Sequence, residues 1–171
     1  MLKYDFDQSV GYWLMLATQS IRRALEARLV EKQITLRQWE VLAWLACDPM
    51  LSQSQIAQAM GIEPPTLAGV VNRMARDGWI EKKNCDDDRR RCRLTPTEQV
   101  EEIWNASVSV AHDVRSEAIA GITPEELEVL KRVCLRIRDN LSQTPTPEPA
   151  DPCEGVDEAA VLREIKVLKS M

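Results

Sequence analysis

The segment that decides the fold covers residues 52–95 and reads SQSQIAQAMGIEPPTLAGVVNRMARDGWIEKKNCDDDRRRCRLT. Its first half predicts two helices, over about residues 53–60 and 63–76, because apolar residues recur in each at three- and four-residue intervals. Gly61 lies between them and is free to adopt the positive φ of a tight turn. Gly78 follows the second helix and is expected to end it. This half therefore predicts two helices joined by a short turn.

The second half of the segment predicts a β-hairpin. Residues 79–85 are expected to form one strand, residues 91–94 the returning strand, and the Asp- and Arg-rich residues 86–90 the tip. Two helices at a turn, followed by such a hairpin, make a winged helix-turn-helix, whose second helix enters the major groove of duplex DNA. The predicted fold class is mainly α with a small β-hairpin wing.

The composition supports a helical chain with a local DNA-binding charge. The 171 residues include a single Phe and two Tyr, whereas Leu, Ala, Glu, Arg and Gln, which favour helices, are abundant. The formal net charge of −5 speaks against a general nucleic-acid binder, because DNA phosphates attract positive charge. Residues 62–95 nevertheless carry a net charge of +2, so the acidity lies mostly elsewhere.

Further helices are predicted on both sides of residues 52–95. A long amphipathic helix over about residues 9–32 exceeds what one small core needs, so part of its apolar face is expected to contact another chain. A buried helix is expected over residues 35–47 with Thr35 as its N-cap. Thr95-Pro96 is expected to start a long helix that reaches about residue 120.

The last predicted helix of this part begins at Thr123-Pro124-Glu125-Glu126, where Thr123 and Glu126 have the spacing of a capping box. Its apolar residues form a near-heptad seam of the kind that usually meets another helix. The seam consists of Leu127, Leu130, Cys134, Ile137 and Leu141.

The second helix of the helix-turn-helix has a candidate DNA-binding face. Its free N–H groups and the Thr66 hydroxyl are expected to hold a phosphate, and Asn72 is expected to pair with both hydrogen-bonding groups of an adenine edge. Arg73 and Arg76 are expected to reach flanking phosphates. The alternative is an ordinary amphipathic helix with a solvated face. The predicted DNA-binding set in the helices and first strand is Ser54, Pro65, Thr66, Gly69, Asn72, Arg73, Arg76 and Lys82.

The hairpin tip adds a candidate minor-groove contact. Arg90 is expected to enter the narrow minor groove, where negative potential is concentrated, and Asp88, two residues earlier, is expected to brace it. Arg89 would face phosphate on the other side. The alternative is a solvated turn in which three Asp and three Arg neutralise one another.

The order of these features resembles the multiple-antibiotic-resistance regulator (MarR) family of bacterial transcription factors over about residues 6–141. Residues 52–67, SQSQIAQAMGIEPPTL, and residues 78–90, GWIEKKNCDDDRR, are most similar to its SlyA-like branch. The resemblance implies a homodimer joined by the N-terminal helix and the two C-terminal helices. Its two recognition helices would lie in successive major grooves of a pseudo-palindromic operator.

The resemblance also carries over individual residues. Thr66 matches the small hydroxyl residue that starts the recognition helix, and Arg73 matches a polar position near its end. Asp88, Arg89 and Arg90 match the basic D-x-R motif of the wing, which Leu94-Thr95 closes. Two departures stand out: Gly69 replaces a base-reading Arg of the SlyA-like branch, and the stretch from Arg90 to Leu94 is two residues short.

On this resemblance the chain divides into five parts. Residues 1–34 are expected to be an N-terminal dimerisation helix, 35–95 the DNA-binding lobe, and 96–141 the C-terminal dimerisation helices. Residues 142–155, with four Pro and three acids, are expected to be a linker, and residues 156–171 an accessory helix.

Family members often bind aromatic acids or phenols between the dimer base and the DNA-binding lobe. Trp13, Arg22, Trp39 and Trp44 are at plausible positions for such an effector, although Trp is more often a core residue. Some members sense oxidants through a thiol. Cys85 and Cys92 flank the wing tip, where a disulfide would distort the wing, although two unrelated small residues are the commoner explanation.

Other features limit the function. Cys47 and Cys134 fall on apolar faces and are expected in the core, and the single histidine, His112, offers no zinc-ligand spacing. No nucleophile elbow or Gly-rich phosphate loop indicates an enzyme, and no cofactor is expected. No signal peptide or membrane-length apolar run is evident, so a cytoplasmic location with reduced thiols is expected. The two remaining hypotheses are a DNA-binding regulator and a winged-helix protein-interaction module.

Overall fold

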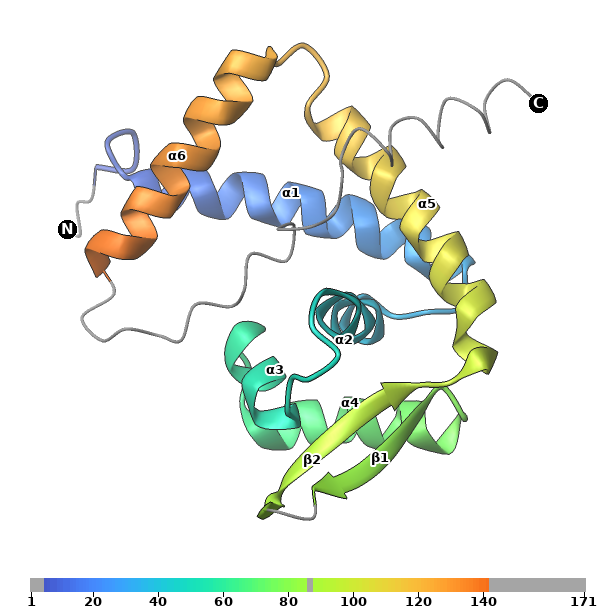
Figure 1. The fold of residues 1–171 in the computed structure, drawn as a ribbon. Helices are drawn as coiled ribbons and strands as arrows, with labels where there is room; N and C mark the ends of the chain where they lie inside the picture. The colour runs from blue at the N-terminus through green and yellow to red at the C-terminus, as the bar shows by residue number, and fades with distance from the viewer. Residues whose placement is uncertain (1–4, 86–87, 142–171) are drawn as a thin grey trace, which may run out of the picture.

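The computed structural model describes residues 5–85 and 88–141, and the side chains of residues 84–92 lie outside this description. Six α-helices, one short 3₁₀ helix (η1) and two strands follow one another in this part of the chain (Figure 1). In order, they are α1 (Val10–Glu31), α2 (Leu36–Cys47), α3 (Gln53–Ala59), α4 (Pro64–Arg76), β1 (Ile80–Cys85), β2 (Asp88–Pro96), η1 (Glu98–Val100), α5 (Glu101–Ala118) and α6 (Pro124–Leu141).

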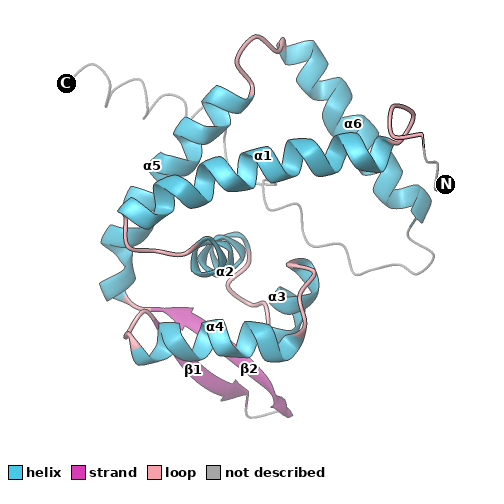
Figure 2. Ribbon diagram, turned by 180° about the vertical axis from the view of Figure 1, so that it is seen from behind, coloured by secondary structure: helices cyan, strands magenta, loops and turns pink. Residues whose placement is uncertain are grey.

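The elements form a compact lobe and a helical frame. Helices α2, α3 and α4 and the hairpin make up the lobe, whereas α1, α5 and α6 form a triangle of long helices at the other end (Figures 1 and 2). Helix α4 lies along the outer side of the lobe next to the hairpin. The mainly α fold with a two-stranded wing is therefore confirmed.

Helix boundaries follow from side chains that cap the first turn. Thr35 starts α2, where its N–H donates to Gln38 Oε1 at 2.9 Å and its Oγ1 accepts from the Gln38 N–H at 3.3 Å. Ser52 starts α3 with the same reciprocal pair through Gln55. Thr123 starts α6 in the same way, with Glu126 as its partner. Each box satisfies two backbone N–H donors that the helix itself leaves unpaired.

The core lies inside the lobe and extends to the inner ends of α1 and α5. The inward residues expected for α4, which are Leu67, Val70, Val71 and Met74, are all buried. Leu29 of α1 and Val110 and Val114 of α5 join the same cluster. The lobe and the frame therefore share one continuous apolar core, although only the inner half of α1 contributes to it.

Two glycines take up the backbone shape that the turns require. Gly61 has φ of +60° between α3 and α4, and Gly78 has φ of +77° after α4. The positive φ favours glycine at position 78, whereas the one close neighbour of an added Cβ would be the movable end of the Gln99 side chain. The adjacent Thr97 Oγ1 donates to the Gly78 carbonyl oxygen at 2.6 Å, which joins the base of the hairpin to the end of α4.

The hairpin is longer than the sequence predicted. Strand β2 begins at Asp88 and ends at Pro96, so residues 88–90 belong to a strand rather than to the tip. Thr95 pairs with Glu81, and Pro96 pairs with Ile80. The prediction that Thr95-Pro96 starts a long helix was therefore wrong: strand pairing holds both residues, and helix α5 begins at Glu101 after the short η1 turn.

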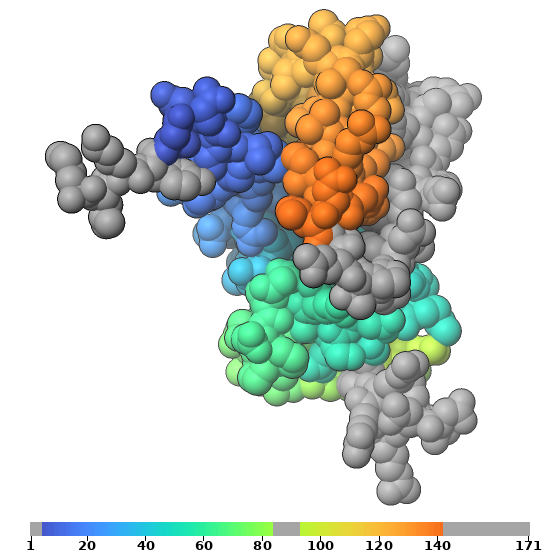
Figure 3. Space-filling view, turned by 90° about the vertical axis from the view of Figure 1, so that its left-hand side faces the viewer, coloured from blue at the N-terminus to red at the C-terminus, as the bar shows by residue number. Residues whose placement is uncertain are grey.

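The outer parts of the frame are poorly covered. Trp13 of α1 is 52% exposed and Leu130 of α6 is 49% exposed. Every residue of α6, which the structure describes from end to end, is at least partly exposed. The first half of α1 and the whole of α6 thus lie at the surface, at the end of the molecule away from the lobe (Figure 3).

Cys47 and Cys134 were expected to be buried in the core. Cys134 is half-buried on α6, but Cys47 is exposed, so its prediction as a core residue was wrong. Cys47 is the last residue of α2, and the chain turns there into the surface loop that leads to α3. Predicted features at residues 86–87, the linker at 142–155 with Cys153, and the accessory helix at 156–171 lie outside the described residues.

Candidate nucleic-acid interface

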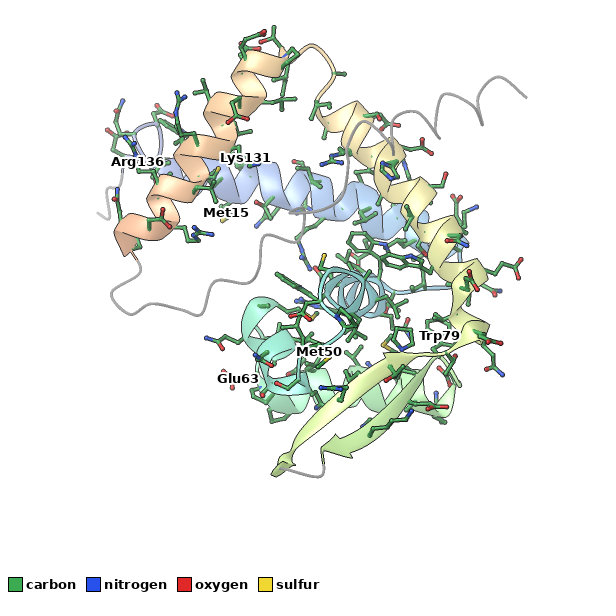
Figure 4. The ribbon with its side chains drawn as sticks, viewed as in Figure 1. Met15, Met50, Glu63, Trp79, Lys131 and Arg136 are labelled. Carbon is green, nitrogen blue, oxygen red and sulfur yellow. The ribbon has the colours of Figure 1, made fainter. Side chains whose placement is uncertain are left out.

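The outward face of α4 is small and polar. Pro65, Thr66, Asn72, Arg73 and Arg76 are exposed, on the side of the helix opposite its buried apolar residues. Glu63 precedes the helix and Trp79 follows it, and the two lie on opposite sides of the lobe (Figure 4). Between them the helix therefore presents one full surface that is free of large apolar side chains.

The start of α4 does not offer the row of free N–H groups that the sequence analysis expected. Pro64 and Pro65 occupy its first two positions and have no N–H. The Thr66 N–H donates to the Glu63 carbonyl oxygen at 2.9 Å. Phosphate binding through these backbone groups was therefore a wrong expectation. The exposed Thr66 hydroxyl is the donor that remains for an anion at this end of the helix.

A polar contact links the face of α4 to the first strand of the wing. Lys82 Nζ donates to Asn72 Oδ1, across ten residues of sequence. Both side chains are exposed, and both belong to the predicted DNA-binding set. The structure thus brings these two residues together, a contact that the sequence analysis did not predict.

The two arginines of α4 differ in their surroundings. A Cβ added at Gly69 would lie 4.0 Å from Arg73 Nη1, so the Arg73 side chain extends back along the helix over Gly69. That distance is an ordinary van der Waals contact, and the helix therefore has room for a larger residue at position 69. Arg76 Nε lies 3.1 Å from Asp77 Oδ1, an exposed ion pair that contributes little by itself.

Ser54 and the wing residues complete the set. Ser54 is exposed on α3, and its Oγ lies 3.1 Å from Ser52 Oγ at the start of that helix. The side chains of Asp88, Arg89 and Arg90 lie outside the described residues, but their backbone belongs to β2. The structure thus places α3, α4 and the hairpin in the relative order of a winged helix-turn-helix.

The backbone register also bears on the two wing cysteines. Cys92 pairs with Asn84, whereas Cys85 pairs with Asp88 across an irregularity between Asn84 and Cys85. Cys85 and Cys92 are therefore near one another in the hairpin but are not directly opposite. Their side chains lie outside the described residues, so a redox role for this pair stays a prediction.

Comparisons with known proteins identify the type of lobe. The profile of the MarR family matches residues 34–92, which run from the start of α2 into β2. The lobe is therefore similar to the winged helix of the MarR family. The matched residues are those of α2, α3, α4, β1 and the first part of β2, which form the compact lobe.

Solved structures extend the similarity to the frame. The crystal structure of the transcriptional regulator PA3341 is 28% identical, with a TM-score of 0.72, and the match covers 80% of this chain and 100% of that one. The MepR–DNA complex from S. aureus is 20% identical, with a TM-score of 0.68 and coverage of 78% and 98%. CouR from Rhodococcus jostii RHA1, bound to p-coumaroyl-CoA, is also 20% identical, with a TM-score of 0.63 and coverage of 85% and 97%. The last two similarities establish the fold alone.

Arg22, one of the predicted effector residues, lies at the junction between α1 and the lobe. Arg22 Nη1 of α1 donates to Glu40 Oε1 of α2, and Arg37 Nη1 donates to Glu40 Oε2 at 3.1 Å. The carboxylate of Glu40 is largely buried and thus has two cationic partners. Arg22 therefore joins the frame to the lobe in this conformation.

The three predicted effector tryptophans are not gathered at one place. Trp39 and Trp44 of α2 are partly buried against the core, as the commoner core explanation predicts for them. Trp13 lies nine residues before Arg22, which is roughly 14 Å along a helix, and is largely exposed. The indole Nε1 of Trp39 is buried without a hydrogen-bond partner, which leaves one donor of α2 unused.

Neither a membrane-spanning helix nor a cluster of metal ligands occurs among the described residues. None of the helices among residues 5–85 and 88–141 is long and apolar enough to cross a membrane. In the same part of the chain, no three His, Cys, Asp or Glu side chains are grouped as a metal site would require.

Proposed function

We propose that the protein is a transcription regulator that binds specific double-stranded DNA as a homodimer. The face of α4 carries this proposal. Its apolar side is packed into the lobe, while Thr66, Asn72 and Arg73 form an exposed polar surface of the size that fits the major groove. The similarity of the fold to MepR, which was solved as a DNA complex, supports the same use of this surface.

The wing supplies the second contact. Arg90 enters the minor groove, Asp88 holds it in place, and Arg89 faces a phosphate. Lys82 and Arg76 add positive charge beside α4, and Ser54 contacts the DNA backbone from α3. The SQSQIAQAMGIEPPTL segment supports a place in the SlyA-like branch of the family, with Gly69 as the departure that removes one direct base contact.

The homodimer is built from the frame. The exposed apolar residues of α1 and α6 form a surface that an isolated chain leaves in water, and such surfaces usually mark an interface. They include Val10, Trp13, Leu16 and Ile21 of α1 and Val129, Leu130, Val133 and Leu135 of α6. With two copies joined there, the two α4 helices reach successive major grooves of a pseudo-palindromic operator.

A small aromatic effector acts at the junction between frame and lobe. CouR has this fold and was solved with p-coumaroyl-CoA, which supports an effector of this class. The unpaired indole N–H of Trp39 is a donor for such a molecule, and an acidic one would compete with Glu40 for Arg22. The effector, or oxidation at Cys85 and Cys92, changes the distance between the two recognition helices and thereby the affinity for DNA.

Selection of bound sequences from a random duplex pool tests this function. We expect a pseudo-palindromic sequence, and we expect Arg90→Ala to weaken its binding strongly without changing thermal unfolding. Equal binding by Arg90→Ala would contradict the role of the wing. Enrichment of no duplex, even at low salt, would contradict DNA binding altogether. That result would instead favour a winged-helix protein-interaction module.

A further inference from the structure

We propose that Lys82 is a positioning residue that sets which base Asn72 recognises, by fixing the orientation of the Asn72 side-chain amide. This inference rests on the proposed DNA-binding function and concerns its specificity. The contact between Lys82 Nζ and Asn72 Oδ1 carries it. The proposal assigns guanine, rather than the adenine expected from Asn alone, to the base that Asn72 contacts.

The fold directs Lys82 toward α4. Successive side chains of a strand point to opposite faces, so Ile80 and Lys82 share one face of β1, and Glu81 and Lys83 share the other. Ile80 is buried in the core against which α4 packs, which shows that this face is turned to the helix. Lys82 therefore reaches Asn72, whereas Lys83 lies on the opposite face and pairs with Glu81 at 3.4 Å.

The hydrogen-bonding chemistry of the Lys82 ammonium fixes the orientation of the Asn72 side-chain amide. A lysine ammonium has three donors and no acceptor, so the atom of Asn72 that faces it must be the oxygen. The NH₂ group of Asn72 is then turned away from Lys82. Asn72 shares its helix face with Pro65 and Gly69, so this NH₂ group is the part that it offers to DNA.

This orientation changes which base edge fits. The adenine contact of Asn requires both its oxygen, as an acceptor, and its NH₂ group, as a donor. Lys82 holds the oxygen on the side of β1, so the NH₂ donor is the part of the amide that is directed at the base. Guanine is the base whose major-groove edge presents two adjacent acceptors, N7 and O6, and it therefore suits an amide nitrogen with two hydrogens.

Sequencing of duplexes selected from a random pool by the full chain and its variants tests the proposal. Asn72→Ala identifies the base pair that Asn72 contacts, since preference should disappear there alone. The parent should prefer guanine at that base pair. In Lys82→Met, whose side chain has similar length but no donor, the preference for guanine over adenine there should fall by about fivefold or more. Preferences at the other base pairs should stay the same.

Two further variants distinguish the positioning of Asn72 by Lys82 from a general effect of positive charge on β1. Lys82→Arg retains a cationic donor and should restore the guanine preference. Lys83→Met removes the same charge from the opposite face of β1 and should leave every base preference unchanged. Thermal unfolding of Lys82→Met should match that of the parent, because Lys82 is exposed.

Several results would contradict the proposed role of Lys82. An unchanged guanine preference in Lys82→Met, a parental preference for adenine, or no effect of Asn72→Ala on any base pair would each overturn the inference while DNA binding stands. Failure of the parent to enrich any duplex would instead contradict the proposed function, and the inference with it.

Discussion

The winged lobe and the outer frame of this chain bury their apolar residues to very different degrees. In the described part of the lobe, Met50 is the one large apolar side chain that is mostly exposed, whereas α1 and α6 each expose several. Met50 lies in the loop before α3, while Met15 of α1 lies with Lys131 and Arg136 of α6 at the far end of the molecule (Figure 4).

The difference shows how the two regions reach stability. In the lobe, helices α2, α3 and α4 find their apolar partners within one chain. In the frame, the outer half of α1 and the whole of α6 have amphipathic sequences but lack a covering partner in the isolated chain. The lobe therefore buries its apolar residues within one chain, with help from the inner ends of α1 and α5, whereas the outer frame does not. The proposed homodimer would cover this outer surface with a second copy.

The largest expected effect comes from placing charge on the exposed surface of the frame. The double substitution Leu130→Glu and Val133→Glu on α6 should raise the dimer dissociation constant by at least about 100-fold, since each buried aliphatic side chain contributes about 1.5–3 kcal/mol. Sedimentation equilibrium measures the change. Met50→Glu places the same charge on the exposed apolar residue of the lobe and should leave the dimer intact. An unchanged dissociation constant after the α6 substitutions would show that the exposed apolar surface of α6 is not the dimer interface.

A smaller effect is expected from a truncation inside the lobe. Leu67 of α4 is fully buried, so Leu67→Ala should lower the free energy of unfolding by about 2–5 kcal/mol. Chemical denaturation followed by circular dichroism measures the loss. Met50→Ala, a truncation at the exposed position, should change the same quantity by less than about 0.5 kcal/mol. Similar losses for the two variants would show that the lobe core is not packed as described.

The smallest effect is expected at an ion pair of the frame. Arg28 Nη2 of α1 donates to Glu117 Oε2 of α5 at 2.6 Å, and this hydrogen bond lowers the pKa of Glu117 below its ordinary value. A carboxyl whose folded-state pKa is lowered stabilises the fold above its unfolded-state pKa, and the contribution is lost as the pH falls through the folded-state pKa. Glu117→Gln should therefore lower the melting temperature slightly at neutral pH and not at all in acid.

A double-mutant cycle with Arg28→Gln isolates this pair from other charges. The coupling should be small, because both groups are well exposed to solvent. A large coupling would mean that charge, rather than apolar burial, holds α1 against α5.

The features that the sequence predicted well depend on local periodicity and chemistry. Leu67, Val70, Val71 and Met74 were expected to face inward, and they do, because a helix of known start fixes the side of each residue. The capping box at Thr123 was predicted for the same reason, since it needs only residues three apart.

The features that the sequence missed depend on contacts between distant residues. Whether Thr95 belongs to a strand or to a helix is decided by its pairing with Glu81 in the hairpin. The contact of Lys82 with Asn72 depends on how β1 lies against α4, and the ion pair of Arg22 with Glu40 depends on how α1 crosses α2. Lys82 was expected to bind DNA, but no sequence pattern indicated its partner on α4.

The binding of the selected duplex as a function of salt tests the central claim most directly. If two MarR-type lobes on one frame contact DNA through α4 and the wing, one dimer should bind each duplex. The logarithm of the binding constant should then fall linearly with the logarithm of salt concentration, with a slope of about −0.9 for each phosphate neutralised. Binding that is insensitive to salt, or a complex with a single chain per pseudo-palindromic duplex, would contradict the account.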